Sequence, residues 1–179
     1  MIGHFGFRPG TKTGLTLTTD SKQFVVIEAK MFSPLSKGTS NAPYYDQAAR
    51  IMACIAWIIS QSHRSVDDFE SLGFYVFAPE EQITKGVFKA QFDVSSIRKK
   101  VKLRIDDYSG HDKKKNSDLQ TWYRDFFTPA LGHIDLRPIP WKSMIDKTHD
   151  PAIQSFYDQC RRFNEKEKPF VTKATEAKW

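Results

Sequence analysis

An acid and a base stand two residues apart in the stretch QFVVIEAKMF, residues 23–32. The stretch is apolar and rich in β-branched residues up to Glu28, so we expect a strand that ends near Lys30. Alternate residues of a strand share a face, so Glu28 and Lys30 should project together while Ala29 faces the other way. A carboxylate can hold a divalent cation, and an ammonium group beside it can orient a water molecule. The pair is therefore a candidate site for metal-assisted hydrolysis.

The same spacing also suits a solvated ion pair at the end of a strand, which is its more frequent role. The charge of the chain bears on this choice. Its 27 Lys and Arg residues outnumber 21 Asp and Glu residues and give a formal net charge of +6. Such an excess favours a polyanionic partner, such as nucleic acid. Chemistry on a phosphodiester therefore becomes the leading interpretation of the pair.

Several other chemistries lack their usual sequence signatures. The five histidines are scattered, without the HxH or HExxH spacing of a zinc site. No glycine-rich phosphate loop, GxSxG elbow or useful pairing of Cys with His occurs in the chain. Nucleotide hydrolysis by a phosphate loop and covalent acyl transfer are therefore unsupported.

Cysteine content and hydropathy predict a soluble, cytoplasmic protein that does not contact a membrane. Cys54 and Cys160 lack CxxC spacing, so thiols in a reducing cytosol are the simplest interpretation. The N-terminus lacks the charged and then apolar plan of a signal peptide. The apolar stretch near residue 55 carries Arg50 and is too short to cross a bilayer.

The first part of the chain predicts three strands and a helix. Residues 15–19 and 24–30 are expected to form a hairpin about a polar turn at 20–22. Residues 5–8 could supply an edge strand before it. The apolar spacing of YYDQAARIMACIAWIISQ predicts a helix over residues 44–61, and this helix should pack on the sheet.

The second part alternates again between strands and helices. The continuous apolar run GFYVFAP, residues 73–79, is typical of a buried central strand. A lysine-rich helix is expected over 87–104, a mobile loop over 106–118 and a helix over 119–127. HIDLRPIPW, residues 133–141, reads as a strand that its two prolines confine to an edge or a strand end.

This order of elements predicts an α/β fold with a mixed central β-sheet flanked by helices. A last helix is expected over residues 151–165. The chain length of 179 residues and the hydrophobic content of 40% suit one domain with its own core, over residues 1–165. Residues 166–179 are expected to form a charged, frayed tail.

The strand that ends in Glu-x-Lys, followed by a loop and a helix, resembles the PD-(D/E)XK nuclease superfamily, with its restriction-endonuclease-like core. The resemblance covers residues 15–79, and the strand LRPIP with the tryptophan after it resembles the superfamily less closely. It implies that Glu28 and the Ala29 carbonyl bind Mg²⁺ or Mn²⁺. It also implies that Lys30 positions the attacking water. Gln47 matches a glutamine found in several branches, and capping or solvation of the helix start is its alternative role.

The superfamily's second carboxylate is missing from the place where the predicted hairpin would put it. Residues 13–15 would face the Glu-x-Lys pair, and Gly14 stands where the superfamily has aspartate. Asp20 lies in the predicted turn, roughly 26 Å along the strand from Glu28. The metal site is therefore either incomplete or completed by Asp46 at the start of the helix.

Lysine-rich segments supply candidate contacts to the phosphates of nucleic acid, with a solvated face as the alternative. The candidates are Lys37, Lys99, Lys100, Lys102, Lys113, Lys114 and Lys115. Tyr44 and Tyr45 are interpreted as packing residues, with base stacking as the alternative. The sequence leaves open whether two copies pair as a homodimer.

Two functions follow, and they differ in whether the protein depends on a metal. The first is a Mg²⁺- or Mn²⁺-dependent nuclease that hydrolyses DNA, weakened by an incomplete metal site. The second is a catalytically inactive module on the same fold that binds nucleic acid or takes part in an assembly. A third and weaker interpretation treats the Glu-x-Lys pair as incidental to a small α/β domain.

Overall fold

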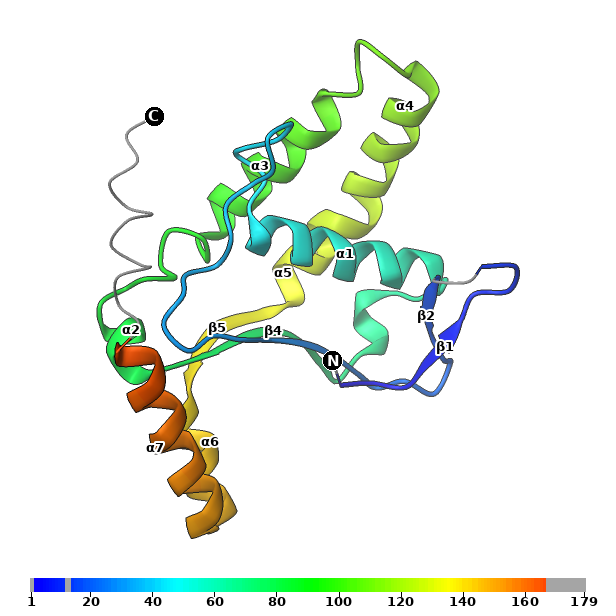
Figure 1. Ribbon diagram of the computed structural model, residues 1–179. Helices are drawn as coiled ribbons and strands as arrows, with labels where there is room; N and C mark the ends of the chain where they lie inside the picture. Colours follow the sequence, from blue (N-terminus) through cyan, green and yellow to red (C-terminus); the bar gives the residue numbers. More distant parts are fainter. Residues whose placement is uncertain (1, 12–13, 167–179) are drawn as a thin grey trace.

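The core of the protein is a three-stranded sheet with helices packed on it. The structure, a computed structural model, describes residues 2–11 and 14–166 (Figure 1). Strands β3 (Gln23–Ala29), β4 (Ser71–Ala78) and β5 (Asp135–Pro140) run parallel in the order β3-β4-β5. Ile2 adds one antiparallel bridge, to Val25. The α/β class with a helix-flanked sheet is confirmed, although the three main strands themselves are parallel rather than mixed.

The connection from β3 to β4 is helix α1 (Gln47–Gln61), which covers one face of the sheet (Figure 1). Every third or fourth residue of α1 is apolar, so one stripe faces the strands. The buried stripe is Ala48, Ala49, Met52, Ile55, Ala56 and Ile59. It packs in one core with Phe24 and Phe74, which are completely buried. Burial of each such phenylalanine stabilises the fold by about 2 kcal/mol. The prediction that both strands share a sheet beneath this helix is confirmed.

The predicted hairpin between residues 15–19 and 24–30 is wrong. Strand β2 (Leu15–Leu17) instead pairs antiparallel with β1 (Phe5–Phe7), in a separate two-stranded sheet. The edge of β3 opposite β4 is bridged instead by Ile2, whose N–H and C=O both bond to Val25.

The segment between β2 and β3 is tied down by a side chain from another part of the chain. Arg64, after α1, donates to the backbone carbonyls of Thr18 and Ser21 at 2.8 Å and 3.1 Å. The Lys22 carbonyl accepts from the backbone of Glu70. These bonds hold residues 18–22 as a connection between two sheets. The residue types of such a connection are the same as those of a hairpin turn, so the local sequence does not distinguish the two.

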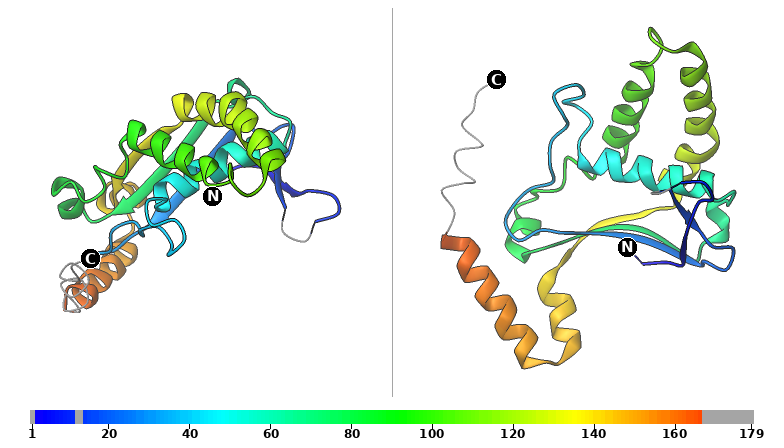
Figure 2. Two further views of the ribbon diagram at one scale, coloured as in Figure 1. Left: turned by 90° about the horizontal axis from the view of Figure 1, so that it is seen from above. Right: turned by 45° about the vertical axis from the view of Figure 1, so that its right-hand side comes forward.

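Four helices and a π-helical turn at Tyr123–Phe127 connect β4 to β5. The helices are α2 (Glu80–Thr84), α3 (Val94–Asp106), α4 (Lys113–Trp122) and α5 (Thr128–His133). Helices α3 and α4 form a hairpin above α1 (Figure 2). The predicted helix over 87–104 begins only at Val94, because Asp93 caps it by accepting from the Ser96 backbone.

The predicted loop over residues 106–118 is wrong in its second half. Helix α4 begins at Lys113, because the Asp112 carboxylate accepts from the Lys115 backbone N–H at 2.9 Å. Such a cap satisfies one of the orphan donors of the first helical turn. The helix predicted over 119–127 is therefore the continuation of α4 through the π-helical turn.

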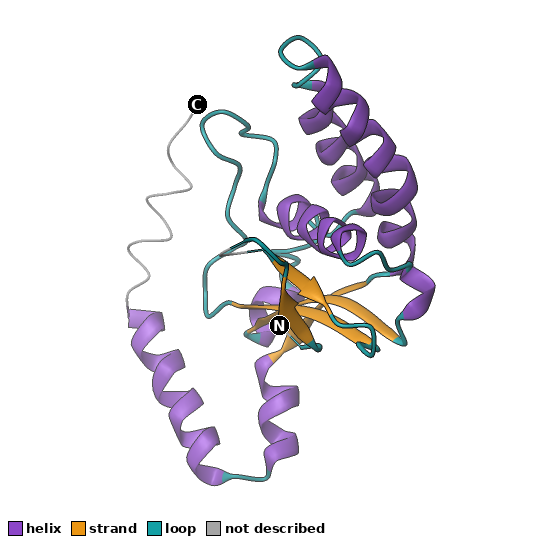
Figure 3. Ribbon diagram, turned by 90° about the vertical axis from the view of Figure 1, so that its right-hand side faces the viewer, coloured by secondary structure: helices purple, strands orange, loops and turns teal. Residues whose placement is uncertain are grey.

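Helices α6 (Trp141–Ile145) and α7 (Pro151–Lys166) project from the other side of the sheet (Figure 3). The edge position of β5 and the final helix are confirmed. Arg161 links α7 to α2 through an ion pair with Glu81 at 2.8 Å. Of the helices in the described ranges, none has the length and apolar character needed to cross a membrane. The predicted tail lies outside the described residues, which end at residue 166.

Candidate active site

Glu28 and Lys30 lie at the carboxyl end of β3, and their side chains meet. The Lys30 ammonium is 2.8 Å from Glu28 Oε1, and the two side chains are 13% and 28% exposed respectively. Both residues share a strand face with Phe24, which is completely buried. The pair therefore projects toward the side of the sheet that α1 covers, at the edge of the core, rather than into open solvent.

Gln47 joins the pair from the first position of α1. Its Oε1 accepts from Lys30 Nζ at 3.3 Å, and also from the backbone N–H and hydroxyl of Ser36 at 2.9 Å and 3.3 Å. The Gln47 N–H in turn donates to the Ser36 carbonyl. The structure thus brings together all three predicted catalytic residues. It also adds Ser36, whose role depends on a loop contact that the sequence does not signal.

The backbone of Lys30 is held from two sides. Its N–H donates to the Phe77 carbonyl at 2.8 Å, which continues the ladder with β4. Its carbonyl accepts from the Trp141 indole N–H, also at 2.8 Å, and that indole packs edge-on against the Phe77 ring. Residues from the ends of all three parallel strands therefore meet here. The carboxyl edge of a parallel sheet is where open α/β folds place their ligands.

The electrostatics of the pair keep Glu28 ionised. Partial burial raises the pKa of its carboxyl group, but hydrogen bonds from Lys30 and Gln47 and the Lys30 charge outweigh it, so the pKa lies below its ordinary value. At neutral pH the site therefore holds a carboxylate and an ammonium group in contact. An ionised carboxylate is a ligand that Mg²⁺ accepts, and an ammonium group can bind a phosphate oxygen.

Asp46, the other predicted metal ligand, has both carboxylate oxygens engaged. Oδ1 accepts from the Ala49 backbone N–H at 3.0 Å and caps α1, while Oδ2 pairs with Lys100 of α3 at 2.7 Å. The residue is only 7% exposed. Its carboxylate thus fastens α1 to α3. Metal ligation by Asp46 stays a prediction, and it would require Lys100 to move.

Gly14 does not face the pair, so the predicted register is wrong. Because β2 pairs with β1, Gly14 lies in the loop between them, where its carbonyl accepts from the Arg8 N–H. Asp20 lies before the start of β3 and pairs with His4 at 3.1 Å. The glycine at position 14 therefore says nothing about the completeness of a metal site near Glu28.

The donor atoms near the pair suit a hydrated magnesium ion. The Lys30 N–H points to β4, so the preceding Ala29 carbonyl points to the free edge of β3. One carboxylate and one carbonyl are oxygen ligands, and Mg²⁺ commonly keeps several waters beside one or two carboxylates. Within residues 2–11 and 14–166, no cluster of three or more His, Cys, Asp or Glu side chains is arranged to hold a metal.

The predicted nucleic-acid contacts separate into paired and exposed lysines. Lys100 and Lys102 form ion pairs with Asp46 and Asp106. The others are exposed on the loop before α1, on α3 and on the first turn of α4: Lys37, Lys99, Lys113, Lys114 and Lys115. Their contact with nucleic acid stays a prediction.

The resemblance to the PD-(D/E)XK superfamily stays a prediction from the sequence. Strand β3, helix α1 and strand β4 follow one another as expected, and Glu28, Lys30 and Gln47 meet at their junction. The antiparallel partner of β3 expected from the chain before it is absent from the described residues, apart from the Ile2 bridge. Comparison with protein-family models, curated proteins and solved structures finds no match to this chain.

Proposed function

We propose that the protein is a nuclease-like hydrolase that cleaves phosphodiester bonds in DNA with the help of Mg²⁺ or Mn²⁺. The observation that supports this most is the contact of Lys30 with Glu28 at 2.8 Å and with Gln47 at 3.3 Å. These groups stand at the carboxyl edge of a parallel sheet, the edge at which open α/β folds place their ligands. The net charge of +6 suits a polyanionic substrate.

Each residue of the site has a separate task in this proposal. Glu28 and the Ala29 carbonyl would hold the metal, which neutralises phosphate charge and lowers the pKa of a bound water. Lys30 supplies a second positive charge to the phosphate or the attacking water. Gln47 and the Trp141 indole fix the side chain and the backbone of Lys30, so the ammonium group stays in place without reorganisation.

A second function, an inactive nucleic-acid-binding module, is favoured by one specific observation. Asp46 is committed to Ala49 and Lys100, so Glu28 is the carboxylate left for a metal in the part of the site that the structure describes. A site with one carboxylate is expected to bind Mg²⁺ weakly. The two functions therefore differ in whether cleavage occurs, while both predict binding to nucleic acid.

The test is nicking of supercoiled plasmid DNA with Mg²⁺, with Mn²⁺ or with EDTA. We expect Glu28→Gln and Lys30→Met to lower the rate by about a hundredfold or more, the usual effect of removing a preorganised charge. Glu80→Gln is the matched control, because Glu80 is an exposed carboxylate that follows β4 at the same edge. DNA binding should persist in all three variants.

The results divide the two functions cleanly. Metal-dependent nicking that is lost in Glu28→Gln and kept in Glu80→Gln supports the nuclease. Wild-type protein that binds DNA but never nicks it supports the inactive module. Strong nicking that survives Glu28→Gln would show that the catalytic centre lies elsewhere in the protein.

A further inference from the structure

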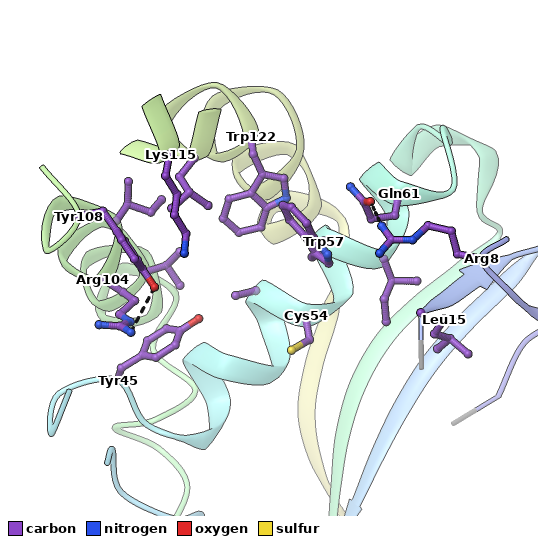
Figure 4. A pocket seen from close by; sticks show the side chains of 16 residues that line it. Arg8, Leu15, Tyr45, Cys54, Trp57, Gln61, Arg104, Tyr108, Lys115 and Trp122 are labelled. Carbon is purple, nitrogen blue, oxygen red and sulfur yellow. Dashed lines mark hydrogen bonds between the residues drawn. The ribbon is translucent and has the colours of Figure 1, made fainter. Parts of the chain in front are cut away.

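A concave site lies on the side of α1 that faces away from the sheet. It is a cavity of about 500 Å³ between α1, α3, α4 and the loop that joins β1 to β2 (Figure 4). Pockets of about 300–1,000 Å³ are the usual size for small organic ligands. The cavity is distinct from the Glu28 site, because none of the residues that line it belongs to β3 or to its carboxyl end.

Aromatic rings dominate the walls of the cavity. Tyr45 lies just before α1 and Trp57 within it, while Tyr108 follows α3 and Trp122 is the last residue of α4. Trp57 is 45% exposed, although its ring packs edge-on against the buried Trp122 at 6.0 Å. A tryptophan left this open beside a cavity offers a flat apolar surface to a ligand.

Positive charges surround the rings, and no described residue of the lining is acidic. The Lys115 ammonium points into the cavity and lies 4.4 Å from the Tyr108 ring centre (Figure 4). It has no carboxylate within 4 Å among the residues that the structure describes. Arg104 also borders the cavity, where it is partly neutralised by Asp107 at 3.3 Å. Arg8, at the other end of the cavity, donates to the neutral Gln61 amide oxygen. Lys115 is therefore the anion-binding group that lies beside the aromatic rings.

One neutral polar group also points into the cavity. The Tyr45 hydroxyl faces its centre, as Figure 4 shows, and no hydrogen bond joins it to a described residue. Burial raises the pKa of Tyr45 to about 12, so the hydroxyl stays protonated at neutral pH. A ligand can therefore receive a hydrogen bond from Tyr45 as well as the charge of Lys115.

We propose that this cavity binds one unstacked nucleotide, with its base against Trp57 and its phosphate at Lys115. The aromatic walls match the flat base, and the Lys115 ammonium group beside the Tyr108 ring matches the phosphate. Free nucleotides and bases within a single strand share this chemistry. The inference rests on the nucleic-acid partner of the proposed function, but not on cleavage, since the cavity and the Glu28 site use different residues.

The experiment measures the affinity of the intact protein for three probes by calorimetry. They are the tetranucleotide dT4, an abasic tetranucleotide with the same phosphates, and the mononucleotide dTMP. We expect wild-type protein to prefer dT4 to its abasic analogue by at least about fivefold, the lower bound for stacking one base on an aromatic side chain. Trp57→Ala should remove that preference, and Glu28→Gln should keep it.

Two lysine variants give a matched control for the phosphate. Lys115→Gln should weaken binding of both dT4 and dTMP several-fold. Lys113→Gln removes another exposed lysine, two residues earlier on α4 and outside the cavity, and should leave dTMP binding unchanged. Both positions are exposed, so these variants are expected to fold even if Trp57→Ala does not.

The outcomes separate this inference from the proposed function. Binding of dT4 without dTMP assigns the cavity to a base within a strand, and equal binding of dTMP assigns it to free nucleotides. Equal affinities for dT4 and the abasic analogue overturn the inference, as does dTMP binding that Lys115→Gln leaves unaltered. Wild-type protein that never nicks DNA but still prefers dT4 to its abasic analogue would discard the nuclease and keep the cavity.

Discussion

The Glu28 site and the cavity, both beside α1, are built on opposite principles. At the first residue of α1, Gln47 completes a polar network in which Lys30 contacts both Glu28 and Gln47. Along its outer face, Trp57 lines an apolar cavity whose lysine, Lys115, contacts only a ring. A closed network loses stability when one partner is removed, because the other is left uncompensated. The exposed side chains of the cavity, Trp57 and Lys115, have few protein contacts to lose and are free to bind a ligand.

The largest expected effect lies within the cavity itself and compares its two tryptophans. Trp122 is buried in the core, so Trp122→Ala should lower the free energy of unfolding by about 3–5 kcal/mol. Trp57 is half exposed, so Trp57→Ala should cost about 1 kcal/mol, mostly its edge-on contact with Trp122. Urea unfolding of both variants measures the difference. Equal losses would show that Trp57 is a structural residue rather than an open binding surface.

The next effect compares the two lysines. Lys30→Met should lower the free energy of unfolding by about 2 kcal/mol. This loss is smaller than that from breaking a fully buried ion pair, because Glu28 keeps some contact with solvent. Lys115→Met should change it by less than about 0.5 kcal/mol. The double variant Glu28→Gln/Lys30→Met should recover part of the loss, as a double-mutant cycle in urea will measure. Additive losses would mean that the pair is a solvated contact without coupling.

The difference between the regions also explains how much of the molecule the sequence predicts. The Glu28 site could be predicted because its three key residues lie on one strand and at the start of the next helix, each with a clear hydrophobic pattern. The cavity could not be predicted, since it combines residues from the loop after β1 through to α4 that share no spacing. Base stacking is the alternative role that the sequence leaves for Tyr45, but nothing in its neighbourhood along the chain indicates Trp57 or Lys115 as companions.

The errors in the predicted fold have physical causes of the same kind. The hairpin prediction used the turn residues at 20–22, but pairing of β3 was decided by Ile2 and by Arg64, which are distant in sequence. The missed start of α4 is different, because its signal was local. Asp112 is a good N-cap, yet the lysines that follow suggested a solvated loop. Capping residues outweigh a low mean hydropathy there.

A smaller effect tests whether Asp46 belongs to the active site or only to its support. Asp46→Asn keeps the cap of α1, because asparagine caps as well as aspartate, but removes the ion pair with Lys100. We expect a loss of about 1 kcal/mol in thermal or urea unfolding and little change in nicking. Asp46→Ala should cost about 1 kcal/mol more through the lost cap. A hundredfold drop in nicking by Asp46→Asn would instead make Asp46 a metal ligand.

The smallest effects concern pH, and the two regions should respond at opposite ends of the scale. The pKa of Glu28 is lowered in the folded protein, where the Lys30 and Gln47 contacts outweigh the effect of burial. A lowered pKa contributes stability above the unfolded value, about 4.3, and this stability is lost as pH falls through the folded value. The unfolding difference between wild type and Glu28→Gln, measured in urea, should therefore be full at pH 7 and shrink below about pH 4.

Tyr45, in the cavity, should make the stability of the protein depend on pH in the alkaline range. Burial raises its pKa from 10.0 to about 12 in the folded protein, so its contribution to stability is present below pH 10 and is lost between these two values. Wild-type protein should therefore lose stability relative to Tyr45→Phe as pH rises from 10 to 12, while the other tyrosines affect both proteins alike. If nucleotide fills the cavity and buries Tyr45 further, saturating dTMP should move this transition to still higher pH. A pH profile identical in both proteins would mean that the Tyr45 hydroxyl is solvated, and the cavity would then lose the neutral donor assigned to it.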